Sequence, residues 1–115
     1  MTNLLQETIQ CIEDSGHEIQ DIVFIGSVVS GHSCTWDDFL LLADIEYDNK
    51  FGAREVAYDL VIVFKDGSNL WRNEYDGSEW WEYSKPVEIP KEQKKILRLT
   101  GGAWASLAAR QENPN

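Results

Sequence analysis

LVIVFKDGSNLWRNEYDGSEWWEY, residues 60–83, is the stretch that decides the fold. It opens with the continuous apolar run Leu60–Phe64, rich in β-branched residues and typical of a strand. Two Asp-Gly pairs follow, Asp66-Gly67 and Asp76-Gly77, and such pairs between strand-like segments are strong signals for hairpin turns. The stretch therefore predicts a three-stranded antiparallel meander, with strands at 56–65, 68–75 and 79–83.

Elements of both types are expected before the meander. Residues 3–14 repeat apolar residues at helical spacing and predict a helix that ends at Ser15-Gly16. The segment 21–29 is apolar on both faces, so we expect it to be an inner strand of the sheet. Thr35 begins a second helix, because Thr35-Trp36-Asp37-Asp38 resembles a capping box in front of an apolar run.

Two short helices are expected after the meander. Pro86 and Pro90 interrupt the chain, and helical segments are predicted at 91–99 and 103–111, on either side of a Gly101-Gly102 hinge. The fold class is therefore α+β: an antiparallel sheet of about four strands packed with N-terminal, middle and C-terminal helices. A chain of 115 residues predicts one domain, residues 1–115.

Charge divides this domain into two parts. Residues 1–84 hold seventeen acidic and four basic residues, a net charge of −13, whereas residues 85–115 hold three acidic and six basic residues, a net charge of +3. The acidic body argues against direct binding of nucleic acid, since phosphate contacts require Lys and Arg. It indicates a polarised surface, and the alternative is that the acidic charge only provides solubility.

Compartment and cofactors follow from what the sequence lacks. The N-terminus has no basic segment followed by an apolar one, and the longest apolar runs are too short for a membrane span, so we expect a cytoplasmic protein without membrane contacts. Cys11 and Cys34 are expected to be free thiols. A zinc site from both cysteines, His17 and His32 would lack any C-x-x-C or H-x-x-x-H pair, so no metal and no cofactor is expected.

Acidic residues cluster in two regions, each with aromatic neighbours. Carboxylates spaced along a strand, as expected for Glu74 and Asp76, lie at distances close to those between phosphates, so they can occupy a basic groove that normally binds DNA or RNA. Consecutive tryptophans at 80 and 81 cannot both point inward, so one is exposed, or else Trp104 or Leu107 covers Trp80. The predicted partner-binding residues are Asp37, Asp38, Asp44, Glu46, Tyr47, Asp48, Glu74, Tyr75, Asp76, Glu79, Trp80 and Glu82.

Catalysis is not expected from these residues. A glycosidase built on Glu74 and Glu82 would need a cleft that shields the carboxylates and separates their pKa values, and two tight hairpins leave little room for one. The phosphate-binding glycine motifs and the G-x-S-x-G motif are absent from the sequence. No catalytic residue is therefore assigned.

Three stretches, Thr35–Phe39, Ala43–Asp48 and Glu74–Tyr83, resemble small proteins encoded by bacteriophages and prophages. The resemblance covers roughly residues 22–85 and brings no catalytic residues with it. Small acidic phage proteins include inhibitors of host defences, among them anti-CRISPR proteins and DNA-mimicking anti-restriction proteins. The resemblance thus implies a non-enzymatic inhibitor in the host cytoplasm that binds a bacterial defence protein or nucleoprotein complex.

Two functional hypotheses follow. In the first, the acidic face mimics DNA and docks on a basic, nucleic-acid-binding surface of the defence complex. In the second, the protein is an assembly module, which includes a possible homodimer, held together by the aromatic hairpin and the C-terminal helices. Salt distinguishes them, because electrostatic docking weakens at high salt and aromatic docking does not.

Overall fold

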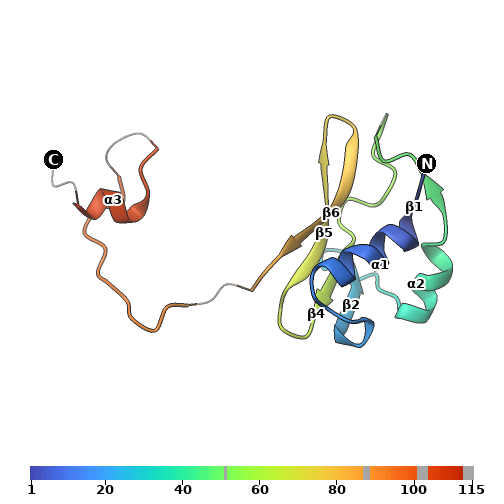
Figure 1. Ribbon diagram of the computed structural model, residues 1–115, viewed down its shortest axis with the longest axis horizontal. Coiled ribbons are helices and arrows are strands. Elements are labelled where there is room, and N and C mark those ends of the chain that lie inside the picture. Colours follow the sequence, from blue (N-terminus) through green and yellow to red (C-terminus); the bar gives the residue numbers. More distant parts are fainter. Residues whose placement is uncertain (51, 87–88, 101–103, 113–115) are drawn as a thin grey trace.

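A computed structural model describes residues 1–50, 52–86, 89–100 and 104–112. Its centre is a four-stranded antiparallel sheet in the order β2-β4-β5-β6 (Figure 1). The strands are β2 (Ile22–Gly26), β4 (Val61–Phe64), β5 (Asn69–Tyr75) and β6 (Ser78–Ser84). The predicted α+β class, the sheet of four strands and the meander are confirmed.

Both Asp-Gly pairs form hairpin turns, of two different kinds. Between β5 and β6, Tyr75 pairs with Ser78, and both Asp76 and Gly77 have positive φ (50° and 86°), as a two-residue type I′ turn requires. Between β4 and β5, the Phe64 N–H donates to the Ser68 carbonyl at 2.9 Å, so the loop contains three residues, with Gly67 in the left-handed region. Asp76 therefore lies in a turn, and the expected strand-like spacing between Glu74 and Asp76 is wrong.

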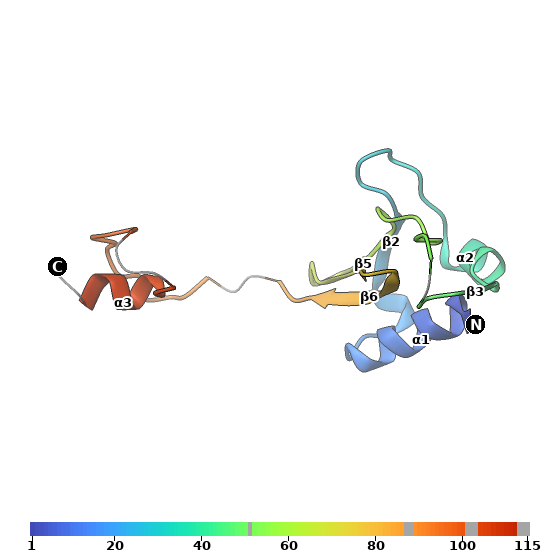
Figure 2. The same cartoon turned by 90° about the horizontal axis from the view of Figure 1, so that it is seen from above.

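One face of the sheet is covered by α1 (Leu4–Asp14), which begins at Asn3, whose side chain accepts a hydrogen bond from the Gln6 N–H (Figure 2). The core lies between this helix and the sheet, and all its residues fall between Leu4 and Tyr83. The buried apolar residues are Leu4, Ile12, Ile25, Phe39, Ala43, Tyr47, Ile62, Phe64, Leu70 and Trp81. The N-terminal body thus contains a complete core of its own.

The second helix, α2 (Trp36–Leu42), begins as predicted, because the Thr35 hydroxyl accepts a hydrogen bond from the Asp38 N–H at 3.1 Å. Its exit continues into β3 (Glu46–Tyr47), which pairs with β1 (Thr2–Asn3) in a separate two-stranded antiparallel sheet. This small sheet holds the loop after α2 against the start of α1, and the Leu5 N–H donates to the Ala43 carbonyl at 2.9 Å.

The strand predicted at 21–29 is shorter and lies at an edge of the sheet, so the inner position expected for it is wrong. It stops at Gly26, where a Cβ atom would lie 2.0 Å from the His32 carbonyl oxygen. The chain then turns back, with the Ser27 N–H donating to that carbonyl, and Val28 and Val29 are exposed. Although Val28 and Val29 are apolar, they lie in a turn at the surface and not in a buried strand.

The strand predicted at 56–65 begins only at Val61. Two hydrogen bonds explain the difference: the Leu60 N–H donates to the Ala57 carbonyl, which closes a turn, and the Val56 N–H donates to the side chain of Glu79. Val56 therefore binds to β6 through a carboxylate, and residues 57–60 form a turn instead of extending the sheet.

The C-terminal segment, residues 89–112, differs most from the prediction. Residues 91–99, all of which are described, contain no helix, and α3 (Leu107–Glu112) is the one helix in the described part of this segment. Helices this short need a surface to pack on, and the segment leads away from the sheet in both views (Figures 1 and 2). The predicted Gly101-Gly102 hinge lies outside the described residues.

Candidate binding surface

The structure brings the two predicted acidic clusters together at one end of the body. The loop after β3 packs against the tip of the β5–β6 hairpin, where the Glu79 N–H donates to the Asn49 carbonyl at 2.9 Å. A Cβ atom on Gly77 would lie 3.2 Å from the Gly52 carbonyl oxygen, so the two loops touch. We call this region the acidic end; its carboxylates are Glu46, Asp48, Glu55, Glu74 and Asp76, and its loop also carries Lys50 and Arg54. Asp44 precedes β3 and accepts a hydrogen bond from the Asn3 side chain at 3.0 Å.

A buried ion cluster supports the acidic end. Arg72 on β5, fully buried, donates to Glu79 Oε1 at 2.9 Å and to the Tyr47 hydroxyl at 3.0 Å. Its other terminal nitrogen lies 3.2 Å from Glu7 Oε1 on α1. The Arg72 guanidinium also lies over the rings of Trp81 (5.0 Å) and Tyr47 (5.6 Å). One cation thus connects α1, β3, β5 and β6.

Glu79 links this cluster to the loop above it. Its two carboxylate oxygens accept hydrogen bonds from the backbone N–H groups of Glu55 (2.8 Å) and Val56 (3.2 Å). Burial raises the pKa of Glu79, but these hydrogen bonds and the one from Arg72 outweigh burial and hold the pKa below its usual value. Glu79 is therefore an ionised structural carboxylate.

Arg72 and Tyr47, two further members of the cluster, have shifted pKa values as well. Burial lowers the pKa of Arg72, but hydrogen bonds with Tyr47 and Glu79 and the nearby carboxylates raise it overall. Burial and the hydrogen bond to Glu7 raise the pKa of Tyr47, whose hydroxyl donates to Glu7 Oε1 at 2.6 Å. Tyr47 stays a neutral donor, and both terminal nitrogens of Arg72 are bonded within the cluster. The buried Nε of Arg72 has no hydrogen-bond partner among the described residues.

Two of the predicted binding residues therefore do not face a partner. Glu79 and Tyr47 are only 2% and 3% exposed, and Asp48 is half-buried. Within the described part of the chain, six predicted carboxylates are exposed and make no hydrogen bond or ion pair. They are Asp37, Asp38, Glu46, Glu74, Asp76 and Glu82.

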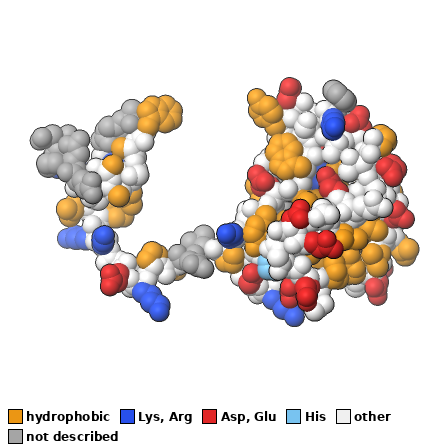
Figure 3. Space-filling model, in the orientation of Figure 1, with side chains coloured by type: hydrophobic (Ala, Val, Ile, Leu, Met, Phe, Trp, Pro, Cys, Tyr) orange, Lys and Arg blue, Asp and Glu red, His pale blue; other side chains and the backbone are white. Residues whose placement is uncertain are grey.

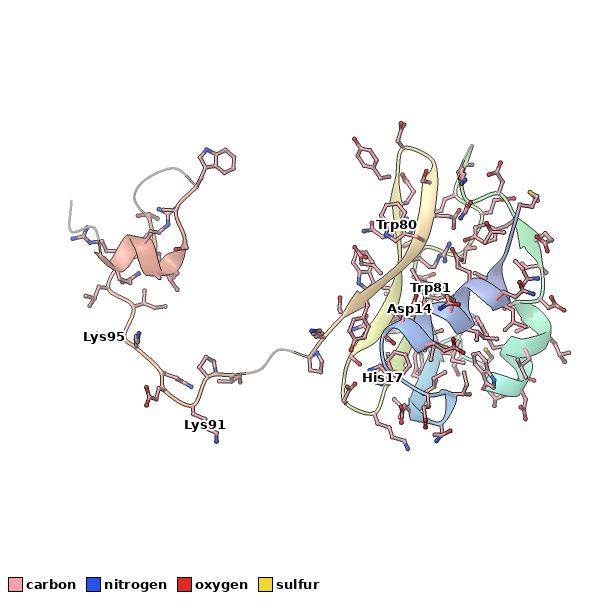
Figure 4. All side chains as sticks on the ribbon, viewed as in Figure 1. Asp14, His17, Trp80, Trp81, Lys91 and Lys95 are labelled. Atoms are coloured by element: carbon pink, nitrogen blue, oxygen red, sulfur yellow. The ribbon has the colours of Figure 1, made fainter. Side chains whose placement is uncertain are left out.

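The exposed predicted residues do not all lie together. Asp37 and Asp38 are in the first turn of α2, at the opposite end of this helix from Asp44. Glu82 lies on β6 directly opposite Trp71, on the side of the sheet away from α1. Of the predicted aromatic residues, Tyr75 is 77% exposed next to Asp76, and Trp80 is half-buried. Figure 4 labels Trp80 on the β5–β6 hairpin, and Figure 3 shows acidic side chains spread over the visible side of the body.

Arg72 was not predicted, although the sequence held the signal for it. Along β5, Arg72 has the same parity as Leu70, and along β6, Glu79 has the same parity as Trp81. Opposite charges at two core-facing positions on hairpin-linked strands indicate a buried pair.

A second polar cluster surrounds His17, which stacks on Phe64 with ring centroids 4.0 Å apart. The Ser68 hydroxyl lies 2.9 Å from His17 Nε2, and Asp21 lies 3.7 Å from Nδ1, so the residue types match a Ser-His-Asp triad. Ser68 is, however, fully buried, and its hydroxyl donates to Asp66, which lowers the pKa of that carboxyl. A substrate has no access to this hydroxyl. The cluster connects the turn at His17 to Phe64 and Ser68 of the β4–β5 hairpin.

No match was found for this chain in comparisons with protein-family models, curated proteins and solved structures.

The cysteines at 11 and 34 are free thiols, and burial raises the pKa of each. Among the described residues, no helix is long and apolar enough to cross a membrane, and no group of three or more His, Cys, Asp or Glu side chains is placed to hold a metal ion.

Proposed function

We propose that the protein is a non-enzymatic inhibitor that binds a basic, nucleic-acid-binding surface through its acidic end. The observation that carries this proposal is the joining of two acidic clusters, far apart in sequence, by direct contacts between the loop at 49–56 and the hairpin tip. Glu46, Glu74 and Asp76 are exposed there and have no internal partners among the described residues.

A rigid support favours this role. Carboxylates compete with phosphates for Lys and Arg only if they are already in position, since ordering them on binding costs conformational entropy. Here Glu79 holds both ends of the neighbouring loop. Its N–H donates to the Asn49 carbonyl, and its carboxylate accepts hydrogen bonds from the N–H groups of Glu55 and Val56. Tyr75, next to Asp76, adds an exposed aromatic ring of the kind that anchors many interfaces.

The target that we propose is a bacterial defence protein or nucleoprotein complex, as the phage-protein resemblance of residues 22–85 implies. Such a target binds DNA or RNA through a positively charged groove, and an acidic domain with a body charge of −13 is attracted to this groove over long range. Binding of the protein and binding of nucleic acid should then exclude each other.

The test is affinity capture from bacterial lysate with two matched variants. The first variant combines Glu46→Lys, Glu74→Lys and Asp76→Asn; asparagine is chosen because it tolerates the positive φ of the turn. The control combines Gln6→Lys, Gln10→Lys, Glu13→Lys and Asp14→Asn, which changes the net charge equally on the exposed side of α1.

The proposal expects nucleic-acid-binding proteins to be captured at about 50 mM salt and released at about 200 mM salt or by added DNA. The first variant should lose them and the control should keep them. Equal loss by both variants would show unspecific attraction to net charge, and capture that resists both salt and DNA would contradict mimicry.

An assembly role, the alternative, draws on a different part of the molecule. Apolar side chains that no core residue covers lie on one sheet face and along the C-terminal segment. These residues do not depend on the acidic end.

A further inference from the structure

The side of the sheet away from α1 is apolar and lies outside the core. The strand register pairs Val61 with Trp71, Val63 with Phe24 and Asn73 with Trp80, and these residues alternate with the buried Ile62, Leu70 and Trp81. We call this side the open face; its apolar residues are Phe24, Val61, Val63, Trp71 and Trp80. All are partly or largely accessible, and Trp71 is 37% exposed.

The C-terminal segment presents a second apolar surface. Trp104 is fully exposed, and Ile96, Leu97 and Leu99 are exposed by half or more. The described parts of the segment are connected to each other, because the Gln111 side chain bonds to the backbone of Leu97, Arg98 and Leu107. Exposed tryptophan and leucine in an ordered segment indicate a surface that binds another apolar surface.

Charge makes the two surfaces complementary. The body has a net charge of −13 and residues 85–115 one of +3. Lys91 and Lys95 project from the C-terminal segment (Figure 4), and Glu82 lies among the open-face residues, directly opposite Trp71. Docking the segment on the open face would pair opposite charges at the rim of an apolar contact.

The linker favours docking on another molecule over docking on the same one. Proline at 86 and at 90 fixes φ, and the residues before them, Lys85 and Ile89, are biased toward extended backbone. Both views show the segment leading away from its own sheet (Figures 1 and 2).

We propose that two copies of this chain form a reciprocal dimer in which the C-terminal segment of each copy docks on the open face of the other. Such an exchange satisfies both apolar surfaces at once with twofold symmetry. A stable interface of about 1,200 Å² in total needs only about 300 Å² on each of the four participating surfaces. Burial of Trp104 alone supplies about 150–250 Å² of this.

The first experiment uses single cysteines in full-length chains whose native cysteines are replaced (Cys11→Ala, Cys34→Ala). One chain carries Asn73→Cys, on the open face, and the other carries Ser106→Cys, in the C-terminal segment. Mixing them under mild oxidation should give a disulfide-linked heterodimer well above the amounts of either homodimer. A control chain with Glu13→Cys, on the exposed side of α1, should cross-link several-fold less.

A chain that carries both Asn73→Cys and Ser106→Cys tests the same molecule as the occupant. If this chain cross-links within itself as a monomer while the mixture gives no heterodimer, the segment docks on its own sheet and the proposal is overturned. Absence of any selective cross-link overturns it as well.

The second experiment is molar mass by light scattering over a range of concentrations. The full chain should change from the 13.2 kDa monomer to a species of twice that mass. Trp104→Ser, which lies outside the core, should raise the dimer dissociation constant at least tenfold, whereas Tyr58→Ser, another exposed aromatic residue, should leave it unchanged. A monomer at all concentrations contradicts the dimer but leaves the acidic-end proposal intact.

Discussion

The two faces of the β5–β6 hairpin carry similar residues that have different roles. Toward α1, Arg72, Glu79 and Trp81 are buried; Arg72 donates a hydrogen bond to Glu79, and Trp81 donates one to Thr8. On the open face, Trp71, Trp80 and Glu82 are accessible. Residue type therefore does not determine the role here; the parity of a position along the strand and its burial do. Mutations of the buried inner-face residues should affect folding, whereas mutations of accessible residues, on the outer face or at the exposed inner-face position Glu74, should affect binding.

The largest contrast is expected between the adjacent tryptophans. Trp81→Ala removes a core side chain whose indole donates to the Thr8 hydroxyl at 2.9 Å, so we expect the free energy of unfolding to fall by about 3–5 kcal/mol. Trp80→Ala, on the open face, should cost less than about 1 kcal/mol. Chemical denaturation of both variants measures the difference, and equal losses would contradict the division into two faces.

A second contrast concerns two glutamates that lie directly opposite each other, Glu74 and Glu79. Glu79→Gln weakens the charged hydrogen bond with the buried Arg72, and we expect it to lower the unfolding free energy by about 1.5–3 kcal/mol. Glu74→Gln, at an exposed position, should stay within about 0.5 kcal/mol of wild type. Urea titrations of the two variants side by side test this.

The third contrast compares two indole hydrogen bonds of the same length, 2.9 Å. Trp81 Nε1 donates to Thr8 on the inner face, and Trp71 Nε1 donates to Ser84 on the outer face. Thr8→Val leaves a buried N–H without a partner and should cost roughly 1–3 kcal/mol, whereas water replaces the hydroxyl lost in Ser84→Ala at almost no cost. Thermal unfolding of the two variants measures the difference, and a larger loss of stability in Ser84→Ala than in Thr8→Val would contradict the expectation.

Acid should destabilise the protein through Glu79 on the inner face. Because the pKa of Glu79 is lower in the folded state than its ordinary value of 4.5, its stabilising effect is complete above that pH and is lost as the pH falls through the lowered value. Each unit of lowering contributes about 1.4 kcal/mol. The melting temperature of wild type should thus drop more steeply below pH 4.5 than that of Glu79→Gln; parallel curves would show that other groups cause the acid sensitivity.

Local signals predicted the fold well. The Asp-Gly turns, the Thr35 cap and the first helix all depend on neighbouring residues, and the structure confirms them. The strand boundaries were predicted wrongly where a residue distant in sequence determines the local backbone. The His32 carbonyl ends β2 by its close approach to Gly26, and Glu79 keeps residues 55–56 away from the sheet. Tyr47 is buried for the same reason, since Glu7 and Arg72 come from segments far along the chain.

The partners of Arg72 also set an order of events during synthesis. Its hydrogen-bonded or ionic contacts with Glu79, Tyr47 and Glu7 span 7, 25 and 65 residues. The contact between Arg72 and Glu79 can form as soon as β6 emerges from the ribosome. Helix α1 is synthesised first, but the face that carries Thr8 stays uncovered until Trp81 has been added, when nearly three quarters of the chain exists. A nascent chain that stalls before β6 would expose the apolar face of α1, and would be a substrate for chaperones or proteases instead of a partly folded domain.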